Sequence, residues 1–318
     1  MTEPFIVAFS AVQGWLFESV VQPAMFALGL MAYADPTFDA LETAMIGVIE
    51  IVVLYLLLRP LEAWRPVEAW QSRRAVRSDV AYTWLNRIGV LPLLLFVLLV
   101  PLVDGVDGWL RMHDVIPPTL EDLLPIQHNS FAAFVLYLVI LDGVQYAIHR
   151  MQHRFDWWWA LHSLHHSQRQ LSFWADNRNH LLDDLIGTVL LTLVALAIGV
   201  APTQFMMIVI FTRMVESLSH VNARVSFGPF GERLLVSPRF HRAHHAIGVG
   251  HEGAQRGCNF AVLFPFWDLL FRTAHYSARF YPTGITDQLE GRDYGEGLIR
   301  QQWLGLVRLV RTLAPRRA

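Results

Sequence analysis

The sequence predicts an all-α, polytopic membrane protein, in which a helical bundle of about four spans and a helical hairpin carries a cytosolic histidine-rich cap. Three observations support this fold class. Of the 318 residues, 54% are apolar and 16% are charged, whereas soluble domains have roughly 25% charged residues. Apolar stretches recur at lengths that suit a bilayer core of about 30 Å. Most of the 14 histidines follow the last single stretch, in a chain without lysine.

Four stretches qualify as single membrane spans. They are residues 5–33, 44–58, 88–103 and 131–146. Residues 185–200 and 205–211 form a further apolar pair, and the short break Ala201-Pro202-Thr203 between them predicts a helical hairpin, because proline cannot continue the first helix. No repeat or linker divides the chain, so we expect residues 1–318 to form a single membrane domain with residues 131–275 as its functional core.

The distribution of arginine predicts the orientation in the membrane. Residues 59–79 hold five arginines, whereas residues 34–43 hold none and residues 104–130 hold one. Cytoplasmic loops retain positive charge, so we expect both termini and the histidine-rich segment to face the cytosol. No basic segment precedes the first stretch, so a cleaved secretory signal is not expected. The absence of lysine suggests a GC-rich bacterial genome and therefore an inner-membrane location.

Charge and cysteine content exclude several functional classes. The net charge is −2 and no basic run interleaves with aromatic residues, so nucleic acid is not an expected partner. A single cysteine, Cys258, excludes an internal disulfide and a cysteine-ligated iron–sulfur cluster. Residues 297–318 combine arginines with apolar residues at helical spacing, which predicts an amphipathic C-terminal helix that lies on the membrane surface or packs on the cap.

The histidines form three clusters whose spacing is typical of metal sites. Side chains at i, i+3 and i+4 share one face of a helix, so each cluster can aim at least two imidazoles at one point. Eight clustered histidines exceed the four ligands of one tetrahedral zinc, so we expect two metal ions; imidazole suits iron, zinc, copper and nickel alike. The eight are His149, His153, His162, His165, His166, His241, His244 and His245.

Further residues can complete or orient these sites. His180 and His220 are additional candidate ligands, and Glu216 lies one helical turn before His220. Asp142 and Tyr146 continue the stripe of His149 and His153 into the bilayer, so Asp142 is a candidate carboxylate that orients a ligating imidazole. Asp183 and Asp184 are expected to form a polar collar at a helix N-terminus, where the helix dipole favours negative charge. The four remaining histidines are expected to be ordinary surface or core residues, namely His113, His128, His251 and His275.

These motifs resemble the fatty acid hydroxylase and sterol desaturase superfamily of integral-membrane di-metal enzymes. The resemblance covers about residues 142–271. It rests on residues 142–153 (DGVQYAIHRMQH), 159–167 (WALHSLHHS), 220–222 (HVN), 238–245 (PRFHRAHH), 259–260 (NF) and 267–271 (WDLLF). The chain departs from the family at residues 178–181 (RNHL), where members often have Arg-x-His-Pro, and it has no His-Pro-Gly-Gly motif of a fused cytochrome b5 domain.

The resemblance implies that the eight clustered histidines bind two iron ions. It also implies that O2 and electrons from a separate donor serve to hydroxylate or desaturate a membrane lipid, with Asn259 as a further supporting residue. Zinc could replace iron in the purified protein. Hydroxylation is the preferred reaction and desaturation is the alternative. Two less favoured alternatives are a zinc-dependent lipid hydrolase and a metal transporter, although transporter sites tend to lie near the bilayer midplane on repeated halves.

Overall fold

The computed structural model describes residues 2–70, 72–89, 105–106, 108–115, 119–124 and 130–314. In these ranges the chain is helical and has no β-strand; one isolated bridge pairs Ala246 with Thr283. The predicted all-α fold is confirmed. The longer helices are α1 (Thr2–Leu16), α3 (Ala34–Trp64), α4 (Arg73–Arg87), α7 (Ser130–Arg154), α8 (Asp156–His166), α9 (Leu181–Ala197), α10 (Pro202–Ser219) and α14 (Leu298–Leu313). Shorter helices are α2 (Gln22–Leu28), α6 (Leu120–Leu123), α11 (Gly228–Gly231), α12 (Pro238–His244) and α13 (Phe266–Leu270).

Three helical stretches among the described residues are long and apolar enough to cross a membrane. They are Glu3–Leu28, Met31–Trp64 and Ser130–Arg154. The second and third of these contain the predicted spans 44–58 and 131–146. The first predicted span, 5–33, was too long, because the helix ends at Leu28 and Gly29 adopts a left-handed conformation with a φ of +70°. Most of the third predicted span, residues 90–103, lies outside the described residues. The second span is longer than its predicted limits of 44–58, because α3 continues through Pro60 to Trp64. Tertiary contacts hold this last turn: the Glu62 carboxylate accepts backbone N–H groups of Phe173 and Asn222.

The predicted hairpin is present as α9 and α10. Gly199 has a φ of +77° and follows α9, and Pro202 is the first residue of α10. A proline is tolerated there because its missing N–H would have no partner within the helix. Both helices pack against α7 around Tyr137, Leu141 and Ile208, which are buried.

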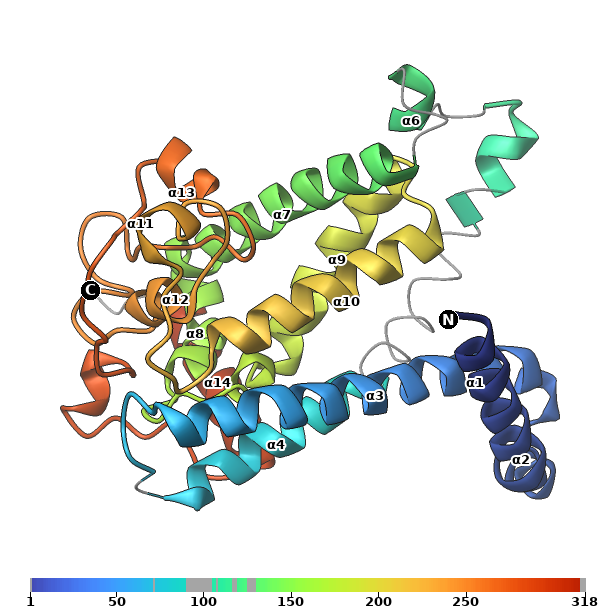
Figure 1. The fold of residues 1–318 in the computed structure, drawn as a ribbon, viewed down its shortest axis with the longest axis horizontal. Coiled ribbons are helices and arrows are strands. Elements are labelled where there is room, and N and C mark those ends of the chain that lie inside the picture. Colours follow the sequence, from blue (N-terminus) through green and yellow to red (C-terminus); the bar gives the residue numbers. More distant parts are fainter. Residues whose placement is uncertain are drawn as a thin grey trace.

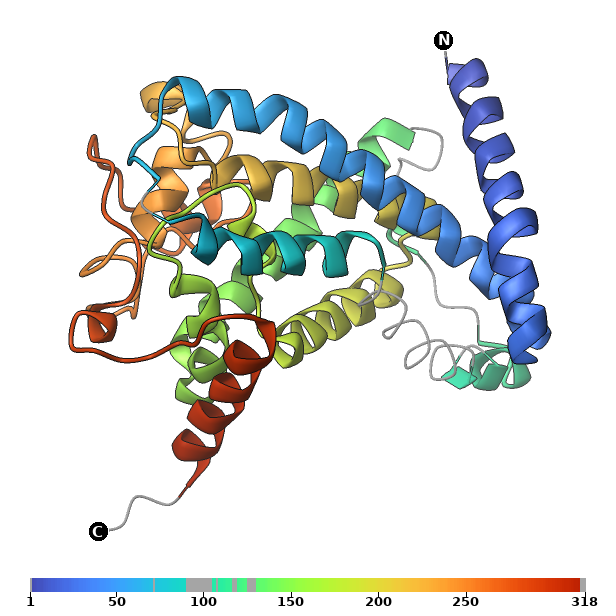
Figure 2. The same cartoon turned by 90° about the horizontal axis from the view of Figure 1, so that it is seen from below.

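The helices place the cap at one end of the molecule. Figures 1 and 2 show α3, α7, α9 and α10 running lengthwise, with α1 and α2 at one end and α8 and α12 at the other. Helices α1 and α2 are therefore remote from the histidine-rich end, whereas α3 extends to it. The lengthwise helices of the bundle pack around an apolar core that includes Tyr137 and Leu141.

Helix α4 is anchored to the bundle by a buried ion network. The Arg87 guanidinium donates to Glu50 of α3 at 2.6 Å and to Asp176 at 2.9 Å, and all three side chains are buried. Gly47 allows this close approach, since a Cβ there would lie 1.7 Å from the Arg87 carbonyl oxygen. The network fixes α4 against α3 and against the segment that follows the second histidine cluster.

The amphipathic C-terminal helix α14 packs on the cap through its polar face. Gln301, Gly305 and Arg308 are buried, and Arg308 donates to the Ala160 carbonyl of α8 at 3.0 Å. Gly305 is required by close packing, because a Cβ there would lie 2.3 Å from the His180 ring. The opposite face is an exposed apolar stripe of Ile299, Trp303, Leu306, Val310 and Leu313. Figure 2 shows α14, in red, projecting from the cap.

Candidate metal centre

Nine buried histidines meet at the cap end of the bundle in two adjacent groups. The first group is His149, His153, His162, His166 and His244, and the second is His165, His220, His241 and His245. In each group, one ligand atom per residue lies within 4.8 Å of all the others. The groups are neighbours, since the rings of His166 and His245 stack at 4.4 Å. The structure therefore brings together all eight clustered histidines and adds His220.

Helical geometry determines which histidines share a group. His149 and His153 lie four residues apart on α7, and His162 and His166 lie four apart on α8, so each pair faces the first group. His165 points elsewhere, because successive residues on a helix are rotated by about 100°. It joins His220, the residue that ends α10, and residues of the third cluster in and directly after α12.

Four of the five histidines in the first group are oriented by a hydrogen bond at Nδ1, and Nδ1 of the fifth, His166, is buried without a partner. Nδ1 of His149 lies 2.8 Å from the Phe260 carbonyl, that of His153 lies 3.1 Å from the Arg256 carbonyl, and that of His244 lies 2.7 Å from the Cys258 carbonyl. Nδ1 of His162 lies 2.9 Å from the Asp183 carboxylate. A carbonyl or carboxylate can only accept, so each Nδ1 carries the proton and each Nε2 keeps a free lone pair directed inward.

The second group has fewer such partners. Nδ1 of His220 lies 2.7 Å from the Glu216 backbone carbonyl. Nδ1 of His165, His241 and His245 is buried without a hydrogen-bond partner. The Nε2 atoms converge instead: His220 lies 3.2 Å from His165 and 3.1 Å from His241, and His241 lies 3.1 Å from His245. The two groups therefore differ in how firmly their rings are held.

Burial favours the neutral form of several of these imidazoles. Removal from water lowers the pKa of His165, His166 and His241 well below the ordinary range for histidine, and the neighbouring imidazoles lower it further. The pKa of His244 and His245 is lowered for the same first reason. A neutral ring is the form that binds a metal ion.

The arrangement of the ring nitrogens suits metal binding better than hydrogen bonding between the rings. Nε2 of His149, His162 and His244 is buried with no protein partner, and an unsatisfied buried polar atom costs about 1–3 kcal/mol. In the second group, facing nitrogens 3.1–3.2 Å apart are close to the separation of neighbouring ligands around one ion with bonds of about 2.1 Å. Two ions would satisfy the inward nitrogens of both groups at once.

His180 lies outside both groups. Its Nε2 lies 2.9 Å from the Gln302 carbonyl of α14, and its Nδ1 accepts the Leu182 N–H at the start of α9. Both ring nitrogens are thus occupied by backbone groups, and the ring caps a helix. Among the histidines expected to be ordinary, His251 and His275 lie outside both groups, as does the exposed His113. His128 lies outside the described residues.

The expected role of Asp142 as a direct partner of a ligating histidine is wrong. Its carboxylate accepts the backbone N–H groups of Leu263 and Phe264 and the indole N–H of Trp267. Asp142 therefore anchors the loop whose carbonyl groups orient the first histidine group. Tyr146 likewise contacts this region through Thr273, at 2.9 Å.

Asn259 and Glu216 also act through the backbone. The Asn259 amide donates to the Phe240 and His275 carbonyls, and the φ of Asn259 is +56°. It thereby links the loop to α12, which carries His241 and His244. Glu216 contacts His220 through its main-chain carbonyl. The predicted neighbour of His220 was therefore correct, but the contacting group is the backbone and not the side chain.

Among the described residues, the carboxylate that contacts a ring of the two groups belongs to Asp183. Besides His162, it accepts the Trp158 indole N–H and the Gln152 amide, both at 2.7 Å. The expectation of a simple polar collar is wrong for this residue. The sequence offered no signal for it, since an acidic residue in the first turn of a helix is ordinary. The carbonyl partners were also beyond the sequence, because every residue has one.

Comparisons with known proteins agree with this geometry. Residues 134–273, which include all nine histidines, match the fatty acid hydroxylase family. Over these residues the chain is similar to the fatty acid hydroxylases. It is 27% identical over 277 residues to the ornithine lipid hydroxylase OlsE of Rhizobium tropici, covering 84% of this chain and 78% of that protein. The family resemblance of the histidine motifs is thereby confirmed.

Two further proteins are similar to part of the chain. An alkylglycerol monooxygenase of Caenorhabditis elegans is 25% identical over 48% of this chain and 28% of its own length. The fatty acid hydroxylase vlmA of a Lecanicillium species is 28% identical over 43% of this chain and 40% of its own length. This chain therefore matches well under half of each of these two relatives. No solved structure is significantly similar to the chain.

Proposed function

We propose that this protein is a membrane-bound di-iron oxygenase that hydroxylates a C–H bond of a lipid. One observation carries the proposal: two adjacent groups of buried imidazoles lie at one end of an apolar helical bundle. Hydroxylation of lipids is the common theme in the names of the three relatives. Residues 131–275 would form the catalytic core of a single membrane domain.

The residues of this chain have distinct tasks in such an enzyme. The five histidines of the first group and the four of the second would each hold one iron ion; iron supplies the O2 chemistry that side chains lack. Asp183 fixes the tautomer of His162 so that Nε2 faces the ion. Burial of the rings excludes bulk water, which limits loss of oxidising equivalents to solvent.

The reaction needs partners that the chain does not supply. For each hydroxyl group formed, one oxygen atom of O2 enters the lipid, and the other leaves as water after uptake of two electrons and two protons. The single cysteine and the absence of a dinucleotide fingerprint in the sequence leave no internal electron chain. A separate electron donor, docked near the cap, would provide the electrons. The lipid would enter laterally between the spans.

We place the protein in a bacterial inner membrane with the cap and both termini in the cytosol. This orientation rests on the five arginines between residues 59 and 79. Reporter fusions at Ala314 and within residues 108–115 test it, since the first site should report the cytosol and the second the opposite side. A cytosolic signal from residues 108–115 would contradict the orientation.

The decisive experiment combines product analysis with metal analysis. Cells expressing the protein are grown under labelled O2, and their lipids are compared by mass spectrometry with those of cells expressing His165→Ala. We expect a lipid to gain one labelled oxygen atom only with the wild-type protein. We also expect iron in the purified wild-type protein and a lower iron content in the variant. The matched control is His113→Ala, an exposed histidine outside both groups.

Other outcomes would replace the proposal. Loss of two hydrogen atoms from a lipid, without labelled oxygen, would indicate desaturation. Zinc in place of iron together with lipid hydrolysis would indicate a hydrolase. Unchanged iron content in His165→Ala would contradict the ligand role of the second histidine group.

A further inference from the structure

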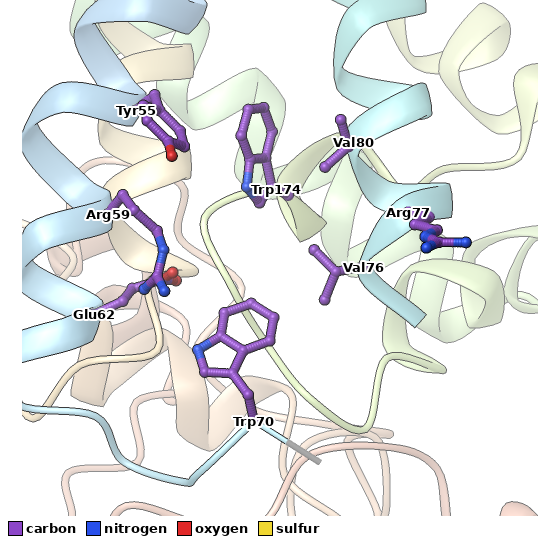
Figure 3. Close-up of a pocket in the computed structure, with 8 residues that line it drawn as sticks. All are labelled: Tyr55, Arg59, Glu62, Trp70, Val76, Arg77, Val80 and Trp174. Atoms are coloured by element: carbon purple, nitrogen blue, oxygen red, sulfur yellow. The ribbon is translucent and has the colours of Figure 1, made fainter. Parts of the chain in front are cut away.

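A cavity of about 550 Å³ lies between α3 and α4. Its lining includes Tyr55, Arg59 and Glu62 of α3, Trp70, Val76 of α4 and Trp174, and none of the nine histidines. Figure 3 shows the α3 side chains on one wall and the valines of α4 on the other, with Trp174 and Trp70 between them. The cavity is distinct from the metal centre.

Three strong hydrogen-bonding atoms on this lining are buried without a partner. They are Nη1 of Arg59, Oε2 of Glu62 and Nε1 of Trp70. Leaving a buried donor or acceptor unsatisfied costs about 1–3 kcal/mol, and more for a charged group. Three such atoms on one cavity indicate that it is built to receive a polar ligand.

Hydrogen bonds to the backbone hold the Glu62 side chain in place. Glu62 is 1% exposed, and its Oε1 accepts the backbone N–H of Asn222 at 3.0 Å and that of Phe173 at 3.1 Å. One oxygen is therefore fully used by the fold while the other remains free. The Arg59 guanidinium attracts this carboxylate, and a cationic ligand at Oε2 would add an ion pair that further offsets the cost of burying the charge.

Arg59 offers the opposite charge one turn away on α3. Its guanidinium lies 5.7 Å from the centre of the Trp70 ring, and no ion pair joins it to Glu62 among the described residues. A ligand that carries both an ammonium and an anionic group would match both side chains. The faces of Tyr55, Trp70 and Trp174 would add favourable contacts with the cation.

The position of the cavity points to a lipid head group. It lies near the end of a candidate membrane span, Met31–Trp64, close to the five arginines of residues 59–79. Aromatic residues and arginines gather at the depth where lipid head groups lie. Tyr55 is 50% exposed, so the α3 wall is accessible from the outside of the bundle.

The cavity is also joined to the metal centre. Asn222, which donates to Glu62, lies two residues after His220, and His220 is part of the second histidine group. We propose that this cavity binds the zwitterionic head group of the lipid substrate, an ammonium with a nearby carboxylate or phosphate, through Glu62 and Arg59. That the bound lipid is the substrate rests on the proposed lipid hydroxylation.

Binding of defined lipids to the purified full-length protein tests the site without turnover. The probes are phosphatidylethanolamine, an N-acyl lysine, phosphatidylglycerol and diacylglycerol, measured by native mass spectrometry. The first two supply the ammonium with a phosphate or with a carboxylate, and whichever binds more tightly identifies the anion. We expect both to bind at least about tenfold more tightly than phosphatidylglycerol and diacylglycerol, which lack the ammonium.

Two variants locate the binding. Glu62→Gln keeps an oxygen for the two backbone N–H groups and removes the free carboxylate oxygen, and Arg59→Gln removes the guanidinium. Each should weaken binding of the zwitterionic lipids about tenfold or more. The matched controls are Glu42→Gln on the same helix and the exposed Arg65→Gln, which should bind as the wild type does. Iron content should be unchanged in all four variants.

The result that would overturn the site is equal binding of phosphatidylglycerol, or wild-type binding by both Glu62→Gln and Arg59→Gln. If Glu62→Gln loses iron, Glu62 has a structural role. Binding by Arg59→Gln then decides whether the cavity holds the head group, since Arg59 makes no contact with the histidine segment among the described residues. Head-group binding without any hydroxylated product would contradict the proposed function but support the binding site. A hydroxylated product with no head-group preference would support the proposed function but contradict the binding site.

Discussion

Replacing Asp183 by asparagine tests how the first histidine group is built. In the wild type, Oδ1 accepts Trp158 and Gln152 at 2.7 Å, and Oδ2 accepts His162 Nδ1 at 2.9 Å. An asparagine can keep its oxygen toward Trp158 and Gln152, because the flipped amide would face two donors and leave them unsatisfied. Its NH2 group then faces His162 Nδ1, where a donor meets a donor.

The ring of His162 can relieve this contact in one way. It moves its proton from Nδ1 to Nε2, and Nε2 is the atom directed toward the other ligands of the first group. A protonated Nε2 cannot bind a metal ion. Loss of such an orienting partner typically weakens metal binding 10–100-fold, which corresponds to about 1.4–2.7 kcal/mol.

The assay is release of iron from the purified protein to a competing chelator, followed by elemental analysis. We expect Asp183→Asn to release iron from the first group 10–100-fold more readily, while the second group, which Asp183 does not contact, is unchanged. Asp184→Asn is the matched control, since this neighbouring carboxylate makes no contact with a ring in either group. If Asp183→Asn releases iron as the wild type does, the orienting role of Asp183 is refuted.

Three further predictions concern stability and membrane contact. The metal-free protein should lose stability as the pH falls below about 6.5, because burial lowers the pKa of rings such as His166 and His241 while the unfolded chain still binds protons. The loss should be about 1.4 kcal/mol per pH unit for each histidine whose pKa is lowered in this way; a melting temperature that rises between pH 8 and 5.5 would contradict this. Arg87→Met should destabilise the protein by about 3–5 kcal/mol, since Glu50 and Asp176 would keep buried charges without a counter-charge; Arg65→Met, at an exposed site, is the control for the melting temperature. A fluorophore on Ile299→Cys, which is 87% exposed on the apolar stripe of α14, should report a less polar environment in vesicles than in solution, and one on Arg300→Cys should not; equal signals would count against membrane contact.

The sequence was most informative where a structural property repeats locally. Apolar runs predicted the spans, and the i, i+3 and i+4 spacing of histidines predicted that His149 and His153, or His162 and His166, would act together. The predicted second span, 44–58, was shorter than α3 at both ends, because an apolar run marks only the hydrophobic part of a helix. At the C-terminal end, contacts of Glu62 with residues far along the chain hold one more turn.

Tertiary structure decided how the clusters were divided and what oriented them. His165 and His166 are neighbours in sequence and belong to different groups, as do His244 and His245, because adjacent residues on a helix point about 100° apart. The sequence could propose two ions, yet their ligand sets arise only when α7, α8, α10 and α12 meet. The choice of Asp183 over Asp142, and of particular loop carbonyls, has the same origin: a hydrogen bond depends on where two distant segments are placed, and neither segment encodes that position alone.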